Sequence, residues 1–219
     1  MTRFPRTLLF SLLFAAGASA HAANAAGVPT KTGVGTKAFD FSKIANNGTT
    51  LAAGAALGTA ATDWACTKDN ITGLTWEVKT TSGLRSSAST YTWYSTDAAS
   101  NGGNAGVANG GTCTGSNCDT QSFVAAVNAG ALCGYSDWRL PNLKDLQTLV
   151  DSSAVAGSAT LDTTYFPNTS LKAYWTANTI ESPPLLGRYA WAVNFGTGRT
   201  QMNYTKLAKN YVYLVRGVQ

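Results

Sequence analysis

The pattern of hydrophobic and polar residues predicts two short helices in the middle of the chain. The first begins at Asp119 or Thr120, either of which can cap it, and it ends at Gly130. The second begins after Asn142, and Asp145 is placed to complete a capping-box exchange. The apolar residues of the second helix recur at helical spacing, and we expect them to form its buried stripe: Leu143, Leu146, Leu149 and Val150.

Strand-like segments lie on both sides of these helices. Residues 74–78 and 189–195 alternate apolar and polar side chains, which is the pattern of a half-buried strand. In the second segment we expect Trp191, Val193 and Phe195 to face the core and Asn194 to face solvent. Shorter strand candidates are found at 91–94, 138–140, 174–177, 199–204 and 211–218. Two helices with antiparallel strands and long loops predict an α+β fold.

The N-terminal segment, residues 1–20, has the pattern of a secretion signal. Arg3 and Arg6 precede an uncharged apolar run, and small residues at 18–20 form a cleavage site. The run is shorter than the ~20 residues that span a bilayer, so we expect no stable membrane insertion. The sequence therefore predicts an exported protein, located in the periplasm, outside the cell or on its surface.

Residues 21–60 are rich in Ala, Gly and Thr and have little periodicity. This composition predicts a flexible leader, with one edge strand near Phe39 and Phe41. We expect the compact domain to occupy residues 61–219, beginning close to Asp63.

Composition and charge restrict the partners of this domain. Only 12% of the residues are charged, and removal of the signal lowers the formal net charge from +5 to +3. No run of Lys and Arg is dense enough for a nucleic-acid groove, so nucleic acid is not an expected partner.

The four cysteines predict two disulfides, because an even number in an exported chain is typical of a disulfide framework. Three connectivities exist. We favour Cys113–Cys118, which closes a Gly-rich loop, and Cys66–Cys133, which ties the first strand region to the end of a helix. A zinc site is the competing interpretation, but its paired short knuckles are missing. We expect no cofactor and assign no metal ligand. Calcium is left open as an alternative, because the one local cluster of oxygen ligands, Asp69-Asn70 with Thr72, is more simply explained as a structural turn.

Catalytic groups are sparse. The only histidine, His21, lies at the cleavage point, so Ser-His and Cys-His pairs are not expected. A paired-carboxylate glycoside hydrolase is the remaining enzymatic alternative. We favour structural roles for its candidate acids: Glu77 on an exposed strand face, Asp119 as a helix cap and Asp137 in a turn. The chain is therefore not expected to be an enzyme.

Several motifs together resemble a known bacterial module, the Lcl C-terminal domain family, over roughly residues 63–218. The segments that carry the resemblance are Cys66-x-x-Asp69-x-x-Thr72-Gly73-Leu74-x-Trp76, Asn128 followed by Cys133-Gly-Tyr-x-Asp137-Trp138-Arg139-Leu140-Pro141, Leu143-x-x-Leu146, Tyr165-Phe166-Pro167-Asn168, Tyr174-Trp175-Thr176, Ala190-Trp191-x-Val193-x-Phe195-x-x-Gly198, and Val212 followed by Val215-Arg216. The resemblance implies a C-type-lectin-like fold, related to that of the formylglycine-generating enzyme. Members of the family include the terminal domain of a collagen-like adhesin that binds glycosaminoglycans, and similar domains serve as variable proteins of diversity-generating retroelements.

We therefore expect a non-catalytic binding module that recognises a glycan or a cell-surface protein through its C-terminal loop and strands. Exposed Tyr, Asn, Arg and Lys side chains are the contact candidates, since such residues form adaptable binding surfaces. They are Asn194, Arg199, Gln201, Asn203, Tyr204, Lys206, Lys209 and Asn210. The alternatives are a plain solvated sheet surface at these positions and a structural cell-envelope protein without a soluble ligand.

Overall fold

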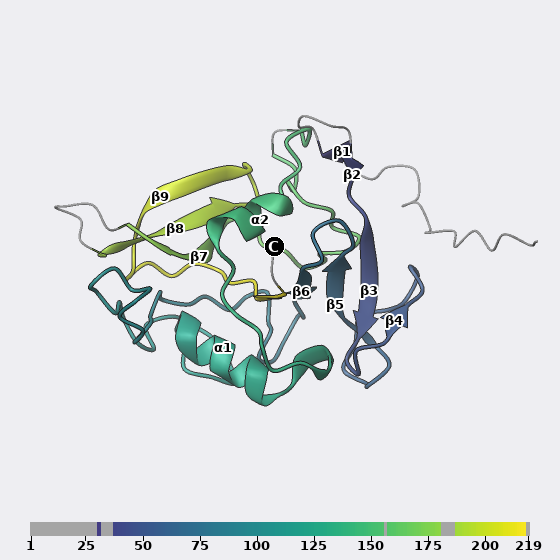
Figure 1. The fold of residues 1–219 in the computed structure, drawn as a ribbon, viewed down its shortest axis with the longest axis horizontal. Helices are drawn as coiled ribbons and strands as arrows, with labels where there is room; N and C mark the ends of the chain where they lie inside the picture. The colour runs from purple at the N-terminus through teal and green to yellow at the C-terminus, as the bar shows by residue number, and fades with distance from the viewer. Residues whose placement is uncertain (1–29, 32–36, 156, 181–186, 218–219) are drawn as a thin grey trace, which may run out of the picture.

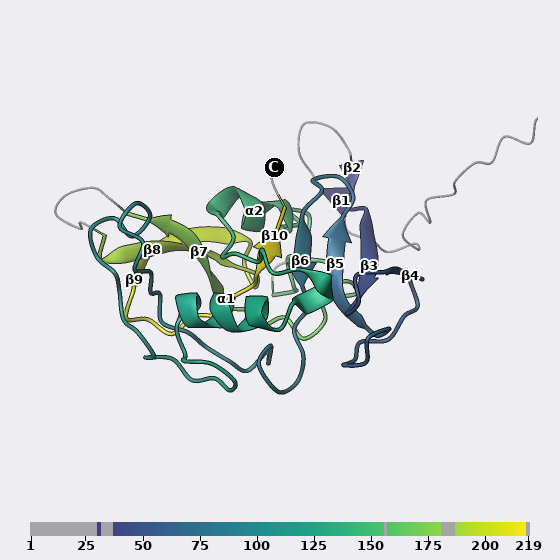
Figure 2. The ribbon, with the colours of Figure 1, turned by 60° about the horizontal axis from the view of Figure 1, so that its bottom comes forward.

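The computed structural model describes residues 30–31, 37–155, 157–180 and 187–217. The predicted signal peptide and residues 21–29 lie outside this range. The described strands form three antiparallel sheets, and the larger two lie toward opposite ends of the domain (Figures 1 and 2). In Figure 1 the shorter helix lies near the centre and the longer one along the bottom. This arrangement confirms the α+β class.

The first sheet is a two-stranded ribbon of β1 (Thr30–Lys31) and β2 (Lys37–Ala38). The second has five strands in the order β10-β6-β5-β3-β4. These are β3 (Phe41–Ala45), β4 (Thr50–Leu51), β5 (Trp64–Asp69), β6 (Thr75–Glu77) and β10 (Val215–Arg216). Since β10 pairs with β6, the C-terminal segment closes the sheet that the N-terminal segments begin.

The third sheet contains β7 (Ala173–Thr179), β8 (Tyr189–Asn194) and β9 (Arg199–Thr205). Its order is β7-β8-β9, so β8 is central and β9 has a partner on one side. The other strand candidates are extended segments with isolated bridges, for example Tyr91 to Asn210 and Arg139 to Val215.

Both predicted helices are present, with the predicted caps. Helix α1 (Thr120–Ala129) begins where the Asp119 carboxylate accepts a hydrogen bond from the Ser122 amide at 2.8 Å. Helix α2 (Leu143–Thr148) has the full capping box: Asn142 and Asp145 each accept the other's backbone N–H at 2.8 Å. A 3₁₀ turn, η1 (Leu132–Gly134), separates the two helices.

Two hydrophobic clusters lie on either side of the β7-β8-β9 sheet. The first contains Trp93, Phe123 and Trp175, and the second contains Trp76 and Tyr213. Strand β8 contributes to both, because its alternate residues point in opposite directions. Its Ala190 and Ala192 belong to the first cluster, and its Val193 belongs to the second.

The expectation of a half-buried strand at 189–195 is therefore wrong in part. Val193 and Phe195 are buried as predicted, but Ala190 and Ala192 on the opposite face are buried too. Trp191, which we expected in the core, is only half-buried. A central strand between two packed layers loses the simple alternation of a surface strand.

The structure contains both favoured disulfides and no free cysteine among the described residues. Cys66–Cys133 joins β5 to η1, and Cys113–Cys118 closes the Gly-rich loop. These disulfides are compatible with an exported protein. Of the helices that the structure describes, none is long and apolar enough to cross a membrane.

The predicted leader boundary needs correction. Residues 39–60 belong to the folded domain, and β3 lies between β5 and β4 rather than at the sheet edge. Phe39 and Phe41 are 3% and 5% exposed, and the Phe41 ring packs 5.3 Å from that of Phe166. Two aromatic side chains on one face anchor the segment, although its Ala/Gly/Thr content suggested flexibility. Residues 21–29 and 32–36 lie outside the described ranges.

Candidate functional site

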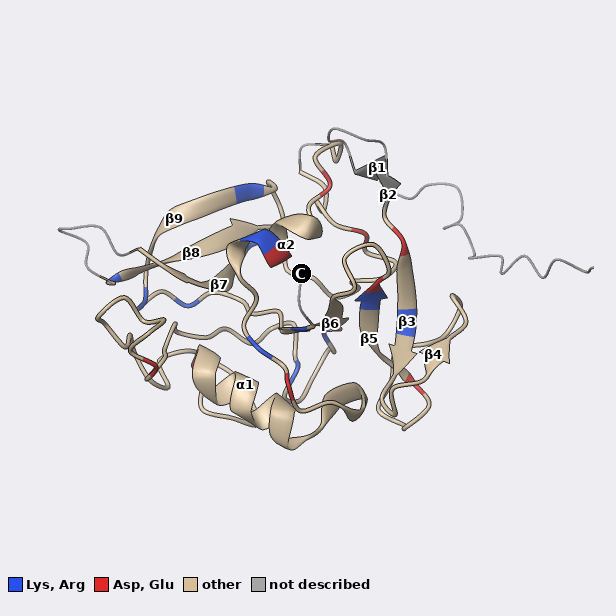
Figure 3. Ribbon diagram, viewed as in Figure 1, with Lys and Arg blue, Asp and Glu red and all other residues tan. Residues whose placement is uncertain are grey.

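Except for Asn194, which ends β8, the predicted contact residues lie on and after β9, the edge strand of the third sheet. Arg199, Asn203 and Lys209 are exposed, as expected for ligand contacts. Two large apolar side chains accompany them: Met202 is 55% exposed and Leu207 is 66% exposed. We call these five residues the β9 surface. Charged residues are otherwise scattered over the ribbon, and Arg199 is the one cation within β9 (Figure 3).

Lys206 is not part of this surface, which corrects the prediction. Its residue is 2% exposed, and its Nζ donates hydrogen bonds to the carbonyl oxygens of Asn101 (2.7 Å) and Asn104 (2.6 Å). The ammonium group also lies 3.8 Å from the centre of the Trp93 ring. Burial lowers the pKa of Lys206 to about 8. Lys206 therefore holds a loop in place and is not available to a ligand.

Asn210 is also unavailable. It is 7% exposed, and its backbone pairs with that of Tyr91 through hydrogen bonds of 2.8 and 3.1 Å. Asn194 is half-buried, and its side chain accepts the Gly196 amide at 2.9 Å within the turn that leads to β9. Both residues support the backbone near the predicted site.

Gln201 and Tyr204 are half-buried because of a bulge in β9. Gln201 pairs with Ala192 and Tyr204 pairs with Ala190, so β9 has one extra residue between these pairs. Both side chains consequently share the face of the two buried alanines. The Tyr204 ring packs edge-on against Trp175 with 6.0 Å between ring centres. Simple alternation along the sequence does not reveal such a bulge.

The cations of the β9 surface do not converge. A strand rises about 3.3 Å per residue, so the seven residues of β9 span roughly 20 Å. Arg199 begins this span and Lys209 follows its end. One small ligand group therefore cannot contact both side chains, whereas an extended chain can.

Glu77 lies in the core, which corrects the expectation of an exposed strand face. Glu77 and Lys79 form an ion pair, and their side chains are 0% and 3% exposed. Burial raises the pKa of Glu77 and lowers that of Lys79, while their mutual attraction opposes both shifts. The Lys79 ammonium also lies 4.6 Å from the centre of the Phe123 ring. Both charged groups of the pair are therefore closed off from solvent.

The other acids that we considered make structural contacts. Asp119 caps α1 and its second oxygen accepts the Asn109 amide at 3.0 Å. Asp137 pairs with Arg216, whose Nε donates at 2.7 Å, and this hydrogen bond lowers the pKa of Asp137. Within the described ranges, no group of three or more His, Cys, Asp or Glu side chains could hold a metal ion.

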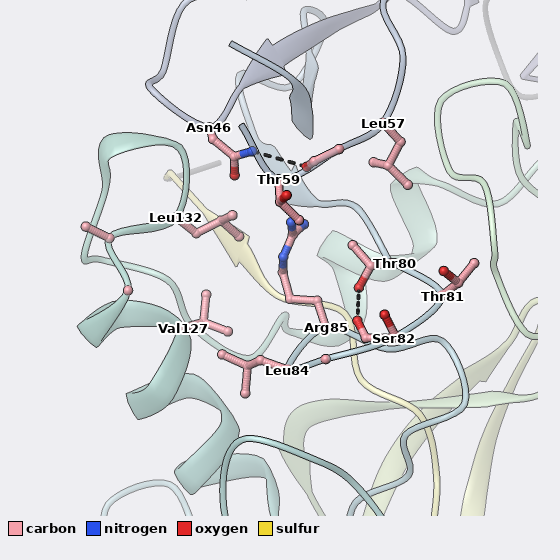
Figure 4. A pocket seen from close by; sticks show the side chains of 14 residues that line it. Asn46, Leu57, Thr59, Thr80, Thr81, Ser82, Leu84, Arg85, Val127 and Leu132 are labelled. Atoms are coloured by element: carbon pink, nitrogen blue, oxygen red, sulfur yellow. Dashed lines mark hydrogen bonds between the residues drawn. The ribbon is translucent and has the colours of Figure 1, made fainter. Parts of the chain in front are cut away.

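A second candidate site, which the sequence analysis missed, is a cavity of about 600 Å³ beside Arg85 (Figure 4). We call it the Arg85 pocket. Its walls come from the segments 57–59 and 80–85, the C-terminal end of α1 and the start of η1, together with Asn46. The only sequence signal for it is a single arginine within a Ser/Thr/Gly-rich stretch.

Comparison with known families identifies the module. The profile of the Lcl C-terminal domain matches residues 65–216, about two thirds of the chain. The chain belongs to the Lcl C-terminal domain family. Searches of curated proteins and of solved structures returned no match. Membership in this family indicates an extracellular or surface module. The C-type-lectin-like relationship stays a prediction of the resemblance.

The Lcl C-terminal domain match begins inside β5 and ends in β10. Strands β3 and β4 precede the matched region, yet they complete the sheet that β5, β6 and β10 begin. The β9 surface lies wholly within the matched region. Most of the Arg85 pocket does too, and only Asn46 and the segment 57–59 of its lining precede the match.

Proposed function

We propose that this Lcl C-terminal domain protein is an exported, non-catalytic binding module. Its ligand is an extended chain, either a glycan or a segment of a cell-surface protein, and it binds along the β9 surface. The observation that carries this proposal is an edge strand and the segment after it, which together expose two cations, one amide and two apolar side chains.

The shape of the surface supports an extended ligand. An edge strand presents backbone N–H and C=O groups along its free side, and a chain laid beside it can use them. Met202 and Leu207 offer apolar contact area, while Arg199 and Lys209 favour acidic groups at the two ends.

The alternatives predict different behaviour. A structural envelope protein would bind no soluble ligand, and a glycoside hydrolase would need two carboxylates facing one cleft. Glu77, Asp119 and Asp137 support the non-catalytic proposal, because each is engaged in an ion pair or a cap.

A glycan array and a pull-down from surface extracts test the proposal with purified mature protein. Simultaneous replacement of Arg199, Asn203 and Lys209 by Ala should weaken any binding signal at least about tenfold, since interface side chains that matter cost more than 1 kcal/mol each. Lys68→Ala is the matched control, because Lys68 is an exposed cation on β5 in the other sheet.

Added salt should weaken binding to the wild type more than binding to the triple variant. Unchanged binding by the triple variant would exclude the β9 surface. Turnover of any glycoside or ester by the purified protein would show that the protein is an enzyme and would contradict the proposal of a non-catalytic binding module.

A further inference from the structure

We infer that the Arg85 pocket is a binding site for a small organic carboxylate, separate from the β9 surface. The pocket contains a half-buried guanidinium group with unused donors, surrounded by hydroxyl groups and apolar side chains. None of its lining residues belongs to the β9 surface.

The guanidinium of Arg85 is held in position by the backbone. Its Nη1 donates to the carbonyl oxygens of Ala65 (3.0 Å) and Val78 (2.6 Å). The 80–87 loop is itself closed by hydrogen bonds from the Thr80 amide to Arg85 and from the Ser87 amide to Thr80. A fixed guanidinium loses little entropy on binding, which favours ligand capture.

Arg85 has donors to spare. No hydrogen bond from its Nε or Nη2 to any residue in the described part of the chain is found. In Figure 4 the guanidinium points into the pocket toward Thr59. An arginine edge with two free N–H groups matches the two oxygens of a planar carboxylate.

The charge balance favours a single negative charge on the ligand. The buried neighbours of Arg85 are Glu77 and Lys79, which compensate each other as an ion pair. Arginine stays protonated, so the cluster carries one uncompensated positive charge. A phosphate dianion would leave one negative charge unmatched beside the buried Glu77 carboxylate, whereas a carboxylate leaves none.

The remaining walls suit the carbon skeleton of such a ligand. A volume of about 600 Å³ lies in the usual range for small-molecule sites. The walls combine hydroxyl groups with apolar side chains: Thr59, Thr80, Thr81, Ser82, Leu57 and Leu84. Hydroxyl partners suit a sugar acid, and apolar partners suit an acylated amino acid. The carboxylate is common to both.

Ligand-observed NMR and calorimetry on the mature protein test this site with four probes. Two are carboxylates, D-glucuronate and N-acetyl-L-alanine, and two are their neutral counterparts, methyl glucoside and N-acetyl-L-alanine amide. At least one carboxylate should bind with a Kd of about 1 mM, and its neutral counterpart should bind at least about tenfold more weakly. The carboxylate that binds shows whether the natural ligand is a sugar acid or an acylated amino acid.

Arg85→Gln should weaken carboxylate binding at least about tenfold, because it removes the positive charge and the paired N–H donors of the guanidinium. Arg188→Gln is the matched control, since Arg188 is an exposed arginine outside both sites. Because Arg85 also donates to two backbone carbonyls, Arg85→Gln alone does not separate loss of the ligand contact from loss of the fold. A second variant at the pocket makes this distinction. Thr59→Trp places a large side chain on an exposed position at the pocket and should abolish binding without lowering Tm.

Three results would overturn the assignment. One is the absence of carboxylate binding at roughly 20 mM, well above the expected Kd. Another is carboxylate binding that survives both Arg85→Gln and Thr59→Trp. The third is tighter binding of inorganic phosphate than of either carboxylate. These results do not depend on the β9 surface, so the two proposals fail or succeed separately.

Discussion

Removing one partner of the buried Glu77–Lys79 pair should destabilise the protein far more than removing both. Apart from each other, the charged atoms of this pair have no hydrogen-bond partner among the described residues. Lys79→Met leaves a buried carboxylate, and Glu77→Leu leaves a buried ammonium. The double variant Glu77→Leu/Lys79→Met leaves an apolar pair of similar volume.

The expected magnitudes follow from the complete burial of both side chains. Breaking a buried ion pair on one side costs about 3–5 kcal/mol, whereas apolar replacement of the whole pair is often neutral or stabilising. For a domain of this size, 1 kcal/mol shifts Tm by about 2–4 °C, so each single variant should lose roughly 6–20 °C. The double variant should melt close to the wild type.

Urea unfolding of all four proteins measures this as a double-mutant cycle. Because each single variant should lose about 3–5 kcal/mol and the double variant almost none, the coupling free energy should reach about 6 kcal/mol or more in size, above the ~0.5–3 kcal/mol usual for residues in contact. The pH response gives an independent check. Burial raises the pKa of Glu77 above its ordinary 4.5, so folded Lys79→Met holds a proton that the unfolded chain releases. This variant should be most stable below pH 4.5 and lose stability as the pH rises.

Additive effects of the two substitutions would refute the reasoning, because they would mean that the charges do not depend on each other. A Lys79→Met variant whose stability rises with pH above 4.5 would contradict the raised pKa of Glu77.

The disulfides and Lys206 give two further predictions. Loss of Cys66–Cys133, with a sequence separation of 67, should cost about 4.4 kcal/mol in the chain-entropy relation. Loss of Cys113–Cys118, with a separation of 5, should cost about 2.1 kcal/mol, and urea unfolding that reverses this order would argue against the relation. Because burial lowers the pKa of Lys206 from 10.5 to about 8, the unfolded chain binds more protons between these values. Above pH 8 the unfolding free energy of the wild type should therefore rise relative to that of Lys206→Met. Parallel pH profiles of the two proteins would contradict the lowered pKa of Lys206.

The sequence analysis expected exposed side chains at the proposed contact positions, and this expectation was correct for some residues and wrong for others for one physical reason. Arg199, Asn203 and Lys209 are exposed, while Lys206 and Asn210 in the same stretch are buried. A local sequence pattern does not distinguish a strand side chain that reaches solvent from one that a distant loop covers. Lys206 contacts Asn101, which lies 105 residues away in sequence.

The Arg85 pocket could not be predicted for the same reason. Its walls come from segments before β5, after β6 and around the end of α1, and only the folded chain brings them together. The arginine itself has no distinctive neighbours in sequence.

The amino-acid sequence by itself was sufficient to predict both helices with their caps, to favour the observed pairing of the cysteines and to indicate the family. Helix caps depend on hydrogen bonds between residues three apart, so Asp119 and the Asn142–Asp145 pair are visible locally. Only the tertiary structure decided that β8 is buried on both faces and that Glu77 lies in the core. Burial and charge pairing depend on which distant segments cover a residue, and these contacts are absent from any local pattern.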